Sequence, residues 1–178
     1  SLLLIDVLIR MKSIESDKKQ LIQLCKKEYQ NNNNELVLVS EFEKDYRKEK
    51  AVWWYTRDSF LYRMLNKALR IQNIDLLFLF RFFIRDIYQQ LKQYQQQSPI
   101  RVFRGQVMSI DELNTLQQSI DNLISINSFF STSTNPDKAL GFLNRSKITS
   151  DLCRVLFIID ADPQVVKSKP FADISSLS

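Results

Sequence analysis

The chain contains only two glycines, Gly105 and Gly141, among its 178 residues. Phosphate loops of the P-loop and Rossmann types need several glycines within one turn, because only glycine lets the backbone approach a phosphate so closely. The sequence therefore excludes both loops. Histidine is absent altogether, which removes the commonest general base, the Ser-His-Asp triad and most catalytic zinc sites. Any chemistry must rest on carboxylates, hydroxyls, arginines and backbone groups.

Length, composition and charge are those of an ordinary soluble globular protein. With 44% hydrophobic and 25% charged residues, the chain can form one domain, or one domain with a helical lobe. The formal net charge is +5, and residues 1–97 hold 17 Lys and Arg against 12 Asp and Glu. Such a basic region could contact nucleic acid or a membrane surface, but a solvated helix face is the commoner explanation. We therefore expect neither partner, and a cytoplasmic monomer.

The most apolar stretch and the two cysteines have plain structural interpretations. Residues 76–84 are interrupted by Arg81, so they predict a buried helix rather than a membrane span. Cys25 and Cys153 lie far apart in the sequence, and two idle thiols explain them better than one disulfide.

Helical patterns dominate the first half of the chain. Apolar residues recur at helical spacing over residues 14–29, and residues 36–48 fit a helix, although the segment ELVLV alone is also typical of a strand. Thr56 is a candidate cap for a helix that begins before Phe60. Residues 74–94 predict a long helix that is largely buried. The aromatic set Trp53, Trp54 and Tyr55 is better explained by packing than by a ligand cage.

The pattern changes near Pro99, so we divide the chain into a helical segment of residues 1–50, a helical lobe of residues 51–97 and a β core of residues 98–178. Residues 100–104 and 152–159 predict strands, the second of them buried, and residues 123–134 predict a strand or an extended run. Ser109 and Asn135-Pro136-Asp137 are typical helix starts.

Two motifs in the β core carry the chemistry. Val102-Phe103-Arg104-Gly105-Gln106 covers the end of the first predicted strand, and Ser131-Thr132-Ser133 begins 27 residues after the arginine. In this order, and with these flanking elements, they resemble the NAD(P)-arginine mono-ADP-ribosyltransferases. That glycosyltransferase family has an arginine on one strand, a Ser-Thr-Ser strand and a later Glu-x-Glu. The resemblance covers residues 98–178, and the tract from Trp53 to Asp86 is similar to the helical lobe of a subset of the family.

The resemblance implies an α+β fold in which a helical N-terminal lobe precedes the mixed β core of an ADP-ribosyltransferase, incomplete at its C-terminus. It assigns Arg104 to the phosphate and nicotinamide ribose of NAD or NADP, because its planar fork of donors suits an oxyanion better than lysine does. Gly105 lets the backbone approach the nicotinamide amide, where a Cβ would collide. No metal is implied.

The second motif completes the implied site. Ser131 bonds to the ribose side of the site and orients the catalytic glutamate. Thr132 and Ser133 point in opposite directions along their strand, one of them into the site. Phe129 or Phe130 supplies an apolar wall near the nicotinamide, and Phe130 is included in the predicted site.

The implied reaction transfers ADP-ribose from NAD to an arginine side chain of an acceptor protein and releases nicotinamide. The ribose passes through an oxocarbenium-like state, which a carboxylate stabilises. The Glu-x-Glu that supplies this carboxylate is expected within about a strand of residues 171–173, and the sequence ends at Ser178 without it. We therefore expect these residues to hold most of a binding site but to be inactive as an enzyme.

Two acidic segments are poor substitutes for the missing motif. Glu41-Phe42-Glu43 has the right spelling but precedes Arg104 and lies in a charged, helical pattern. Asp173 has a shorter side chain and lies on the wrong side of the expected strand. The alternative function is a non-catalytic NAD-binding or protein-interaction module of the same fold.

Overall fold

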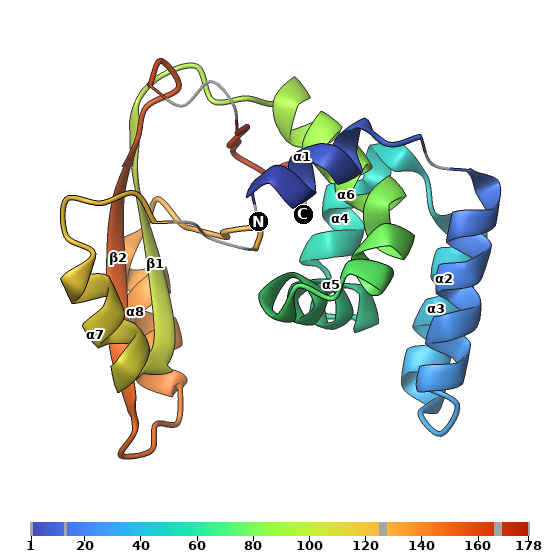
Figure 1. The fold of residues 1–178 in the computed structure, drawn as a ribbon, viewed down its shortest axis with the longest axis horizontal. Helices are drawn as coiled ribbons and strands as arrows, with labels where there is room; N and C mark the ends of the chain where they lie inside the picture. Colours follow the sequence, from blue (N-terminus) through green and yellow to red (C-terminus); the bar gives the residue numbers. More distant parts are fainter. Residues whose placement is uncertain (1, 13, 125–127, 166–168, 178) are drawn as a thin grey trace. The chain divides into compact units, whose positions relative to one another are not determined.

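The computed structural model describes residues 2–12, 14–124, 128–165 and 169–177 (Figure 1). The chain is a mixed α+β protein in which helices predominate, and the described residues form one two-stranded antiparallel sheet. It divides into two compact units. The helical unit comprises Ser1–Gln96 and Lys169–Ser178, and the sheet unit comprises Gln97–Ser168.

The helical unit is built around its longest helix. Its elements are α1 (Leu2–Arg10), α2 (Glu15–Glu28), α3 (Asn33–Asp45), the 3-10 turn η1 (Lys48–Lys50), α4 (Ala51–Thr56), α5 (Phe60–Ile71) and α6 (Ile74–Gln93). Helix α6 contacts α1, α2, α4 and α5, while α2 and α3 pack against each other. None of the described helices is long and apolar enough to cross a membrane.

Aromatic side chains fill the centre of the helical unit. The ring of Phe42, which is fully buried, meets the rings of Tyr46, Trp54, Phe60 and Phe83 at centroid distances of 4.7, 5.2, 6.1 and 6.0 Å. Apart from the first of these, the pairs are edge-to-face, the arrangement that the ring quadrupoles favour. The expected packing role is confirmed for Trp54 and Tyr55, which are buried, whereas Trp53 is 37% exposed.

Local sequence signals predicted most of these helices. Of residues 36–48, which fitted a helix or a strand, residues 36–45 are helical and belong to α3. Helix α3 begins at Asn33 because the side chain of Asn32 accepts a hydrogen bond from the Glu35 amide. The long buried helix is confirmed as α6. Cys25, a buried residue of α2, and Cys153 are both free thiols, and burial raises the pKa of Cys25 to about 12.

The predicted cap at Thr56 is wrong. Thr56 is the last residue of α4, and its hydroxyl donates to the carbonyl of Trp53 at 3.2 Å. Helix α5 instead follows Ser59, whose side chain makes no capping bond. A threonine can bond to its own helix as readily as it caps the next one, so residue type alone did not decide between the two.

The C-terminal segment belongs to the helical unit. Ala172 pairs with Gln95 in an isolated bridge, and the Gln96 amide donates to the carbonyl of Phe171 at 2.9 Å. Residues 169–177 therefore belong to the helical unit, where they pair with the segment that follows α6. The prediction that they belong to the β core is wrong.

The sheet unit consists of two paired strands and two helices: β1 (Ile100–Ser109), α7 (Ile110–Gln118), α8 (Pro136–Arg145) and β2 (Leu152–Ala161). The strands pair in antiparallel register from Ile100 opposite Ala161 to Ser109 opposite Leu152, and Figure 1 shows α8 behind them. Both predicted helix starts are confirmed. Ser109 caps α7 in a capping box with Glu112, and Asn135 caps α8 with Pro136 in the first turn.

Two predictions for the sheet unit need correction. Strand β2 is half-buried rather than buried, and Ile158 is 60% exposed, because a sheet of two strands has little with which to cover its faces. Of the extended run predicted for residues 123–134, residues 125–127 lie outside the described part. Residues 128–134 form no strand of their own, and Ser133 alone makes a bridge, to Phe103.

Candidate functional site around Arg104

Arg104 is half-buried in the middle of β1, and its guanidinium contacts Gln106, Ser131 and Phe130. Its Nε donates to Gln106 Oε1 at 3.2 Å, and its Nη1 donates to the backbone carbonyl of Ser131 at 2.8 Å. Its Cζ lies 4.5 Å from the centroid of the Phe130 ring, within the range of a cation–π contact. These contacts fix the plane of the guanidinium before any ligand binds.

One face of the sheet carries this cluster. Phe157 lies directly opposite Arg104 in the strand register, so the two side chains share a face. The Phe130 ring meets the Phe157 ring edge-to-face at 5.7 Å. Of the two candidate phenylalanines, Phe130 has its ring over Arg104.

The Ser-Thr-Ser motif reaches Arg104 through its backbone. Ser131 offers its carbonyl to the guanidinium, and the side chains of Ser131 and Thr132 are exposed. The hydroxyl predicted to contact a ribose is therefore accessible, one residue from the aromatic ring. The contact through the carbonyl is independent of residue type, and no sequence signal predicted it.

Ser133 is engaged in the entry to α8. Its backbone exchanges two hydrogen bonds with Phe103, at 2.8 and 2.7 Å, along the edge of β1 that β2 leaves open. Its hydroxyl accepts from the Asn135 amide at 3.1 Å, and Asn135 in turn caps the Asp137 amide at 2.8 Å. Turn chemistry of this kind accounts for a serine at this position without a ligand.

Gly105 is required by packing inside the sheet unit. A Cβ built on Gly105 would lie 2.4 Å from the backbone oxygen of Ala139 and 2.7 Å from Leu143 Cγ. Both belong to α8, so the side of Gly105 that lacks a side chain faces this helix. The resemblance implied a close approach of nicotinamide at this glycine, whereas in the structure the glycine is required by the close packing of α8.

Two carboxylates near the C-terminus of the chain, Asp160 and Asp173, are engaged with other partners. Asp160 on β2 makes a two-pronged ion pair with Arg101, at 2.6 and 2.9 Å, which lowers the pKa of Asp160. Strand alternation puts this pair on the face opposite Arg104 and Phe157. Asp173, in the helical unit, accepts hydrogen bonds from the amide and hydroxyl of Ser175 in a turn.

The Glu-x-Glu lookalike is a structural part of α3. Glu41 makes a two-pronged pair with Arg57, which lowers the pKa of Glu41, and Glu43 pairs with Lys26 at 2.6 Å. Phe42 between them is the centre of the aromatic core. The prediction that this segment is helical is confirmed.

Gln106 is the member of the cluster that the sequence analysis missed. Strand alternation could have identified it, because residues two apart on a strand share a face. Within the described ranges, no group of three or more His, Cys, Asp or Glu side chains comes together as metal ligands would.

Comparison of the chain with protein-family models, with curated proteins and with solved structures gives no match. The class of the protein must therefore be argued from the contacts around Arg104.

Proposed function

We propose that the sheet unit forms the NAD-binding part of an arginine-specific mono-ADP-ribosyltransferase, with NADP as a possible replacement for NAD. One observation carries the proposal: Arg104 and Ser131, separated by 27 residues, are joined by a 2.8 Å hydrogen bond beside the Phe130 ring. The family pattern has an arginine on one strand and a Ser-Thr-Ser segment after it, and this contact between the two motifs supports the proposal.

The geometry of Arg104 suits a pyrophosphate. A guanidinium offers five N–H donors in a rigid plane, and here the plane is fixed by Gln106 and by the carbonyl of Ser131. A group fixed in advance loses less conformational entropy when a ligand binds. The apolar rings of Phe130 and Phe157 lie on the same face and can pack against the nicotinamide.

In the proposed reaction the bond between nicotinamide and ribose breaks, and nicotinamide leaves with the bonding electron pair. The ribose then bonds to a guanidinium nitrogen of the acceptor protein, and that nitrogen loses a proton. Arg104 and Ser131 bind and orient NAD. In the family pattern a pair of glutamates stabilises the ribose cation and activates the acceptor, and residues 132–178 contain no glutamate.

Calorimetric titration with NAD tests the role of Arg104. We expect Arg104→Lys to weaken binding about tenfold or more, because lysine replaces a planar fork with a point charge. Arg101→Lys is the matched control: it lies on the same strand, faces the other side and should bind NAD as the unaltered protein does. Failure of the unaltered protein to bind millimolar NAD, or equal losses in the two variants, would refute the proposal.

A second substitution separates the hydroxyl of Ser131 from its backbone. Ser131→Ala removes the group proposed to contact ribose but keeps the carbonyl that holds Arg104. Loss of one such hydrogen bond should weaken NAD binding roughly threefold to tenfold, without a change in the melting temperature. Ser128→Ala, in the same segment, should leave the affinity unaltered, and a similar loss in both variants would count against a specific role for Ser131.

The alternative, a non-catalytic NAD-binding or interaction module, is favoured by one observation. Gly105 and Ser133 both serve the packing of α8, so the motif has structural reasons to persist without catalysis. Release of nicotinamide distinguishes the two. NAD binding that depends on Arg104, without any release by a form that carries a Glu-x-Glu segment, would favour the module.

A further inference from the structure

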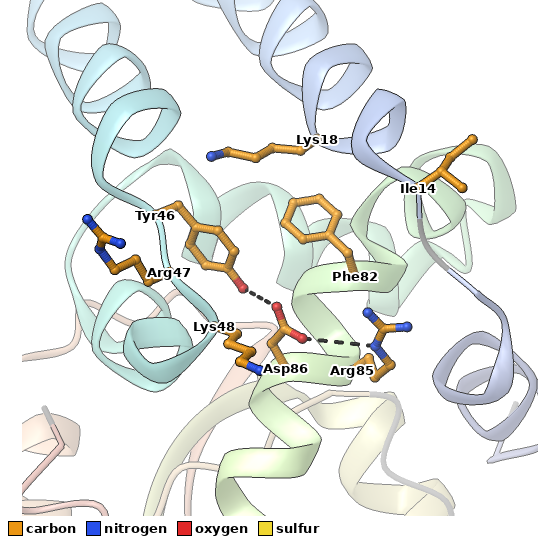
Figure 2. A pocket seen from close by; sticks show the side chains of 8 residues that line it. All are labelled: Ile14, Lys18, Tyr46, Arg47, Lys48, Phe82, Arg85 and Asp86. Atoms are coloured by element: carbon orange, nitrogen blue, oxygen red, sulfur yellow. Dashed lines mark hydrogen bonds and ion pairs between the residues drawn. The ribbon is translucent and has the colours of Figure 1, made fainter.

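A basic pocket lies in the helical unit, remote in sequence from the Arg104 cluster. It has a volume of about 270 Å³ and is bordered by α2, by the segment after α3 and by α6. Figure 2 shows the side chains that line it. Four of them are cationic, and they come from all three segments: Lys18, Arg47, Lys48 and Arg85.

Among the described side chains that line the pocket, Asp86 is the one carboxylate, and it is already engaged. Tyr46 donates its hydroxyl to Asp86 Oδ2 at 2.7 Å, and Arg85 Nε lies 3.9 Å from Oδ1 (Figure 2). The side chain of Asp86 is 15% exposed, and burial raises its pKa above the ordinary value for aspartate. Asp86 therefore compensates at most one of the four positive charges.

The contacts of Lys18 and Lys48 do not neutralise their positive charges. Lys18 donates to the backbone carbonyl of Glu43 at 3.0 Å, which fixes the ammonium but does not neutralise it. Lys48 lies 3.9 Å from the carboxylate of Glu49, in a pair whose side chains are 76% and 68% exposed, and exposed pairs of this kind interact weakly. Cations that line one cavity repel each other and raise the local concentration of anions.

We propose that this pocket binds the phosphate group of a small phosphorylated molecule. A phosphate monoester carries nearly two negative charges at neutral pH and three strong acceptor oxygens, which matches lysines and arginines arriving from several directions. The rings of Tyr46 and Phe82 form the apolar part of the wall. The pocket belongs to the helical unit alone, so the proposal does not depend on the function proposed for the sheet unit.

The size of the pocket limits the ligand. Sites for drug-sized molecules typically occupy about 300–1,000 Å³, so about 270 Å³ suits a phosphate and a small attached group rather than a whole dinucleotide. The phosphate can belong to a soluble ester or to a lipid headgroup, since both present the same dianion.

A pair of double variants with equal charge changes tests the pocket. Lys18→Gln/Lys48→Gln removes two cations that line it. Lys27→Gln/Lys44→Gln removes two exposed lysines from α2 and from the end of α3, near but outside the pocket. Circular dichroism and melting temperatures establish first that both variants fold as the unaltered protein does.

Binding is then measured by calorimetry with inorganic phosphate and AMP, and by flotation with phosphatidylcholine vesicles that contain phosphatidylinositol 4-phosphate. We expect the pocket variant to lose about tenfold or more in affinity, because charged hydrogen bonds are lost, and the control variant to stay within about twofold. Binding of AMP and phosphate identifies a soluble ligand, and binding of vesicles alone identifies a lipid headgroup.

Three results would overturn the proposal. They are the absence of binding to all three probes at low salt, equal losses in the two double variants, and preferential binding to DNA or RNA oligonucleotides with an affinity that grows with their length. The last would show a diffuse basic surface of the kind that neutralises many phosphates at once.

Discussion

The two units bury their apolar side chains to very different extents. In the helical unit, large rings such as those of Phe42, Trp54 and Phe83 are completely enclosed. Among the described residues of the sheet unit, only Met108, Ala139 and Leu143 are buried apolar side chains. The candidate NAD site therefore lies on the thinly packed unit.

The difference shows where each unit obtains its stability. A two-stranded sheet is marginal in water and needs a helix or further strands against it. In the sheet unit that support comes from α8, which packs closely over Gly105 and whose last turn is held by Arg154, a donor to the carbonyls of Leu143 and Ser146 at 2.7 and 2.8 Å. Stability should thus depend on a broad core in one unit and chiefly on the contact between α8 and the strands in the other.

The largest effect is expected at the centre of the helical unit. Phe42→Ala should reduce the free energy of unfolding by about 3–5 kcal/mol, because four surrounding rings cannot collapse into the vacated space. Val37→Ala on the same helix, where the valine is 67% exposed, should change it by no more than about 0.5 kcal/mol. Urea denaturation followed by circular dichroism measures both. Equal effects of the two substitutions would show that Phe42 is not central to the core.

The second prediction compares the loss of stability when a buried ion pair is broken with the loss when an exposed one is broken. Arg81 and Asp17, at 4% and 5% side-chain exposure, are joined at 2.5 Å between α6 and α2. Asp17→Ala should cost about 3 kcal/mol, because the guanidinium of Arg81 loses its counter-charge in the interior. In the sheet unit, Asp160→Ala breaks the exposed pair with Arg101 and should leave the denaturation midpoint unaltered. A comparable loss at both sites would contradict the burial argument.

The two glycines should respond in opposite directions to alanine. Gly105→Ala forces α8 away from β1 and should destabilise the sheet unit by about 1–3 kcal/mol. Gly141→Ala, on α8 itself, has its nearest contact at 3.6 Å and should stabilise the helix by about 0.5–1 kcal/mol. Hydrogen exchange at the paired amides of Phe103 and Ser133 reports on the sheet unit directly. Unaltered exchange in Gly105→Ala would show that α8 does not support the strands.

These contrasts also show what could be predicted from the sequence. The starts of α7 and α8 were predictable because Ser109 and Asn135 cap their helices with bonds to residues two or three positions away. The burial of β2 was not, because its apolar pattern is the same whether one face or both are covered. Coverage depends on which other elements pack there, and that information is not local.

The Arg104 cluster and the basic pocket also differ in how far they could be predicted from the sequence. The motif resemblance assigned Arg104 and Ser131 to one site, but the hydrogen bond that joins them uses a backbone carbonyl that any residue has. The basic pocket assembles Lys18, Lys48 and Arg85 from three helical segments with no motif in common. The packing of α2 and of η1 against α6 brings these charges together.

The smallest expected effect concerns Asp86, a carboxylate of the helical unit whose pKa is raised by burial. Burial raises its folded-state pKa above the unfolded value, against the opposing hydrogen bond from Tyr46. The stability that Asp86 contributes is therefore present below the unfolded pKa of about 3.9 and is lost as the pH rises through the folded pKa. Asp86→Asn keeps an acceptor for the Tyr46 hydroxyl and removes the charge. Its melting temperature at pH 7 should exceed that of the unaltered protein by about 2 °C or less, and the difference should vanish near pH 3.

Tyr46→Phe should have the opposite sign at pH 7. It removes the donor that stabilises the ionised Asp86, and the loss of one such bond costs about 1 kcal/mol. Its effect should shrink as the pH falls and Asp86 gains a proton, because the bond then no longer involves a charge. Melting curves of both variants from pH 3 to pH 7 test this pairing. If both variants are destabilised equally at every pH, the two side chains act through packing alone, and the pocket tolerates the buried carboxylate without cost.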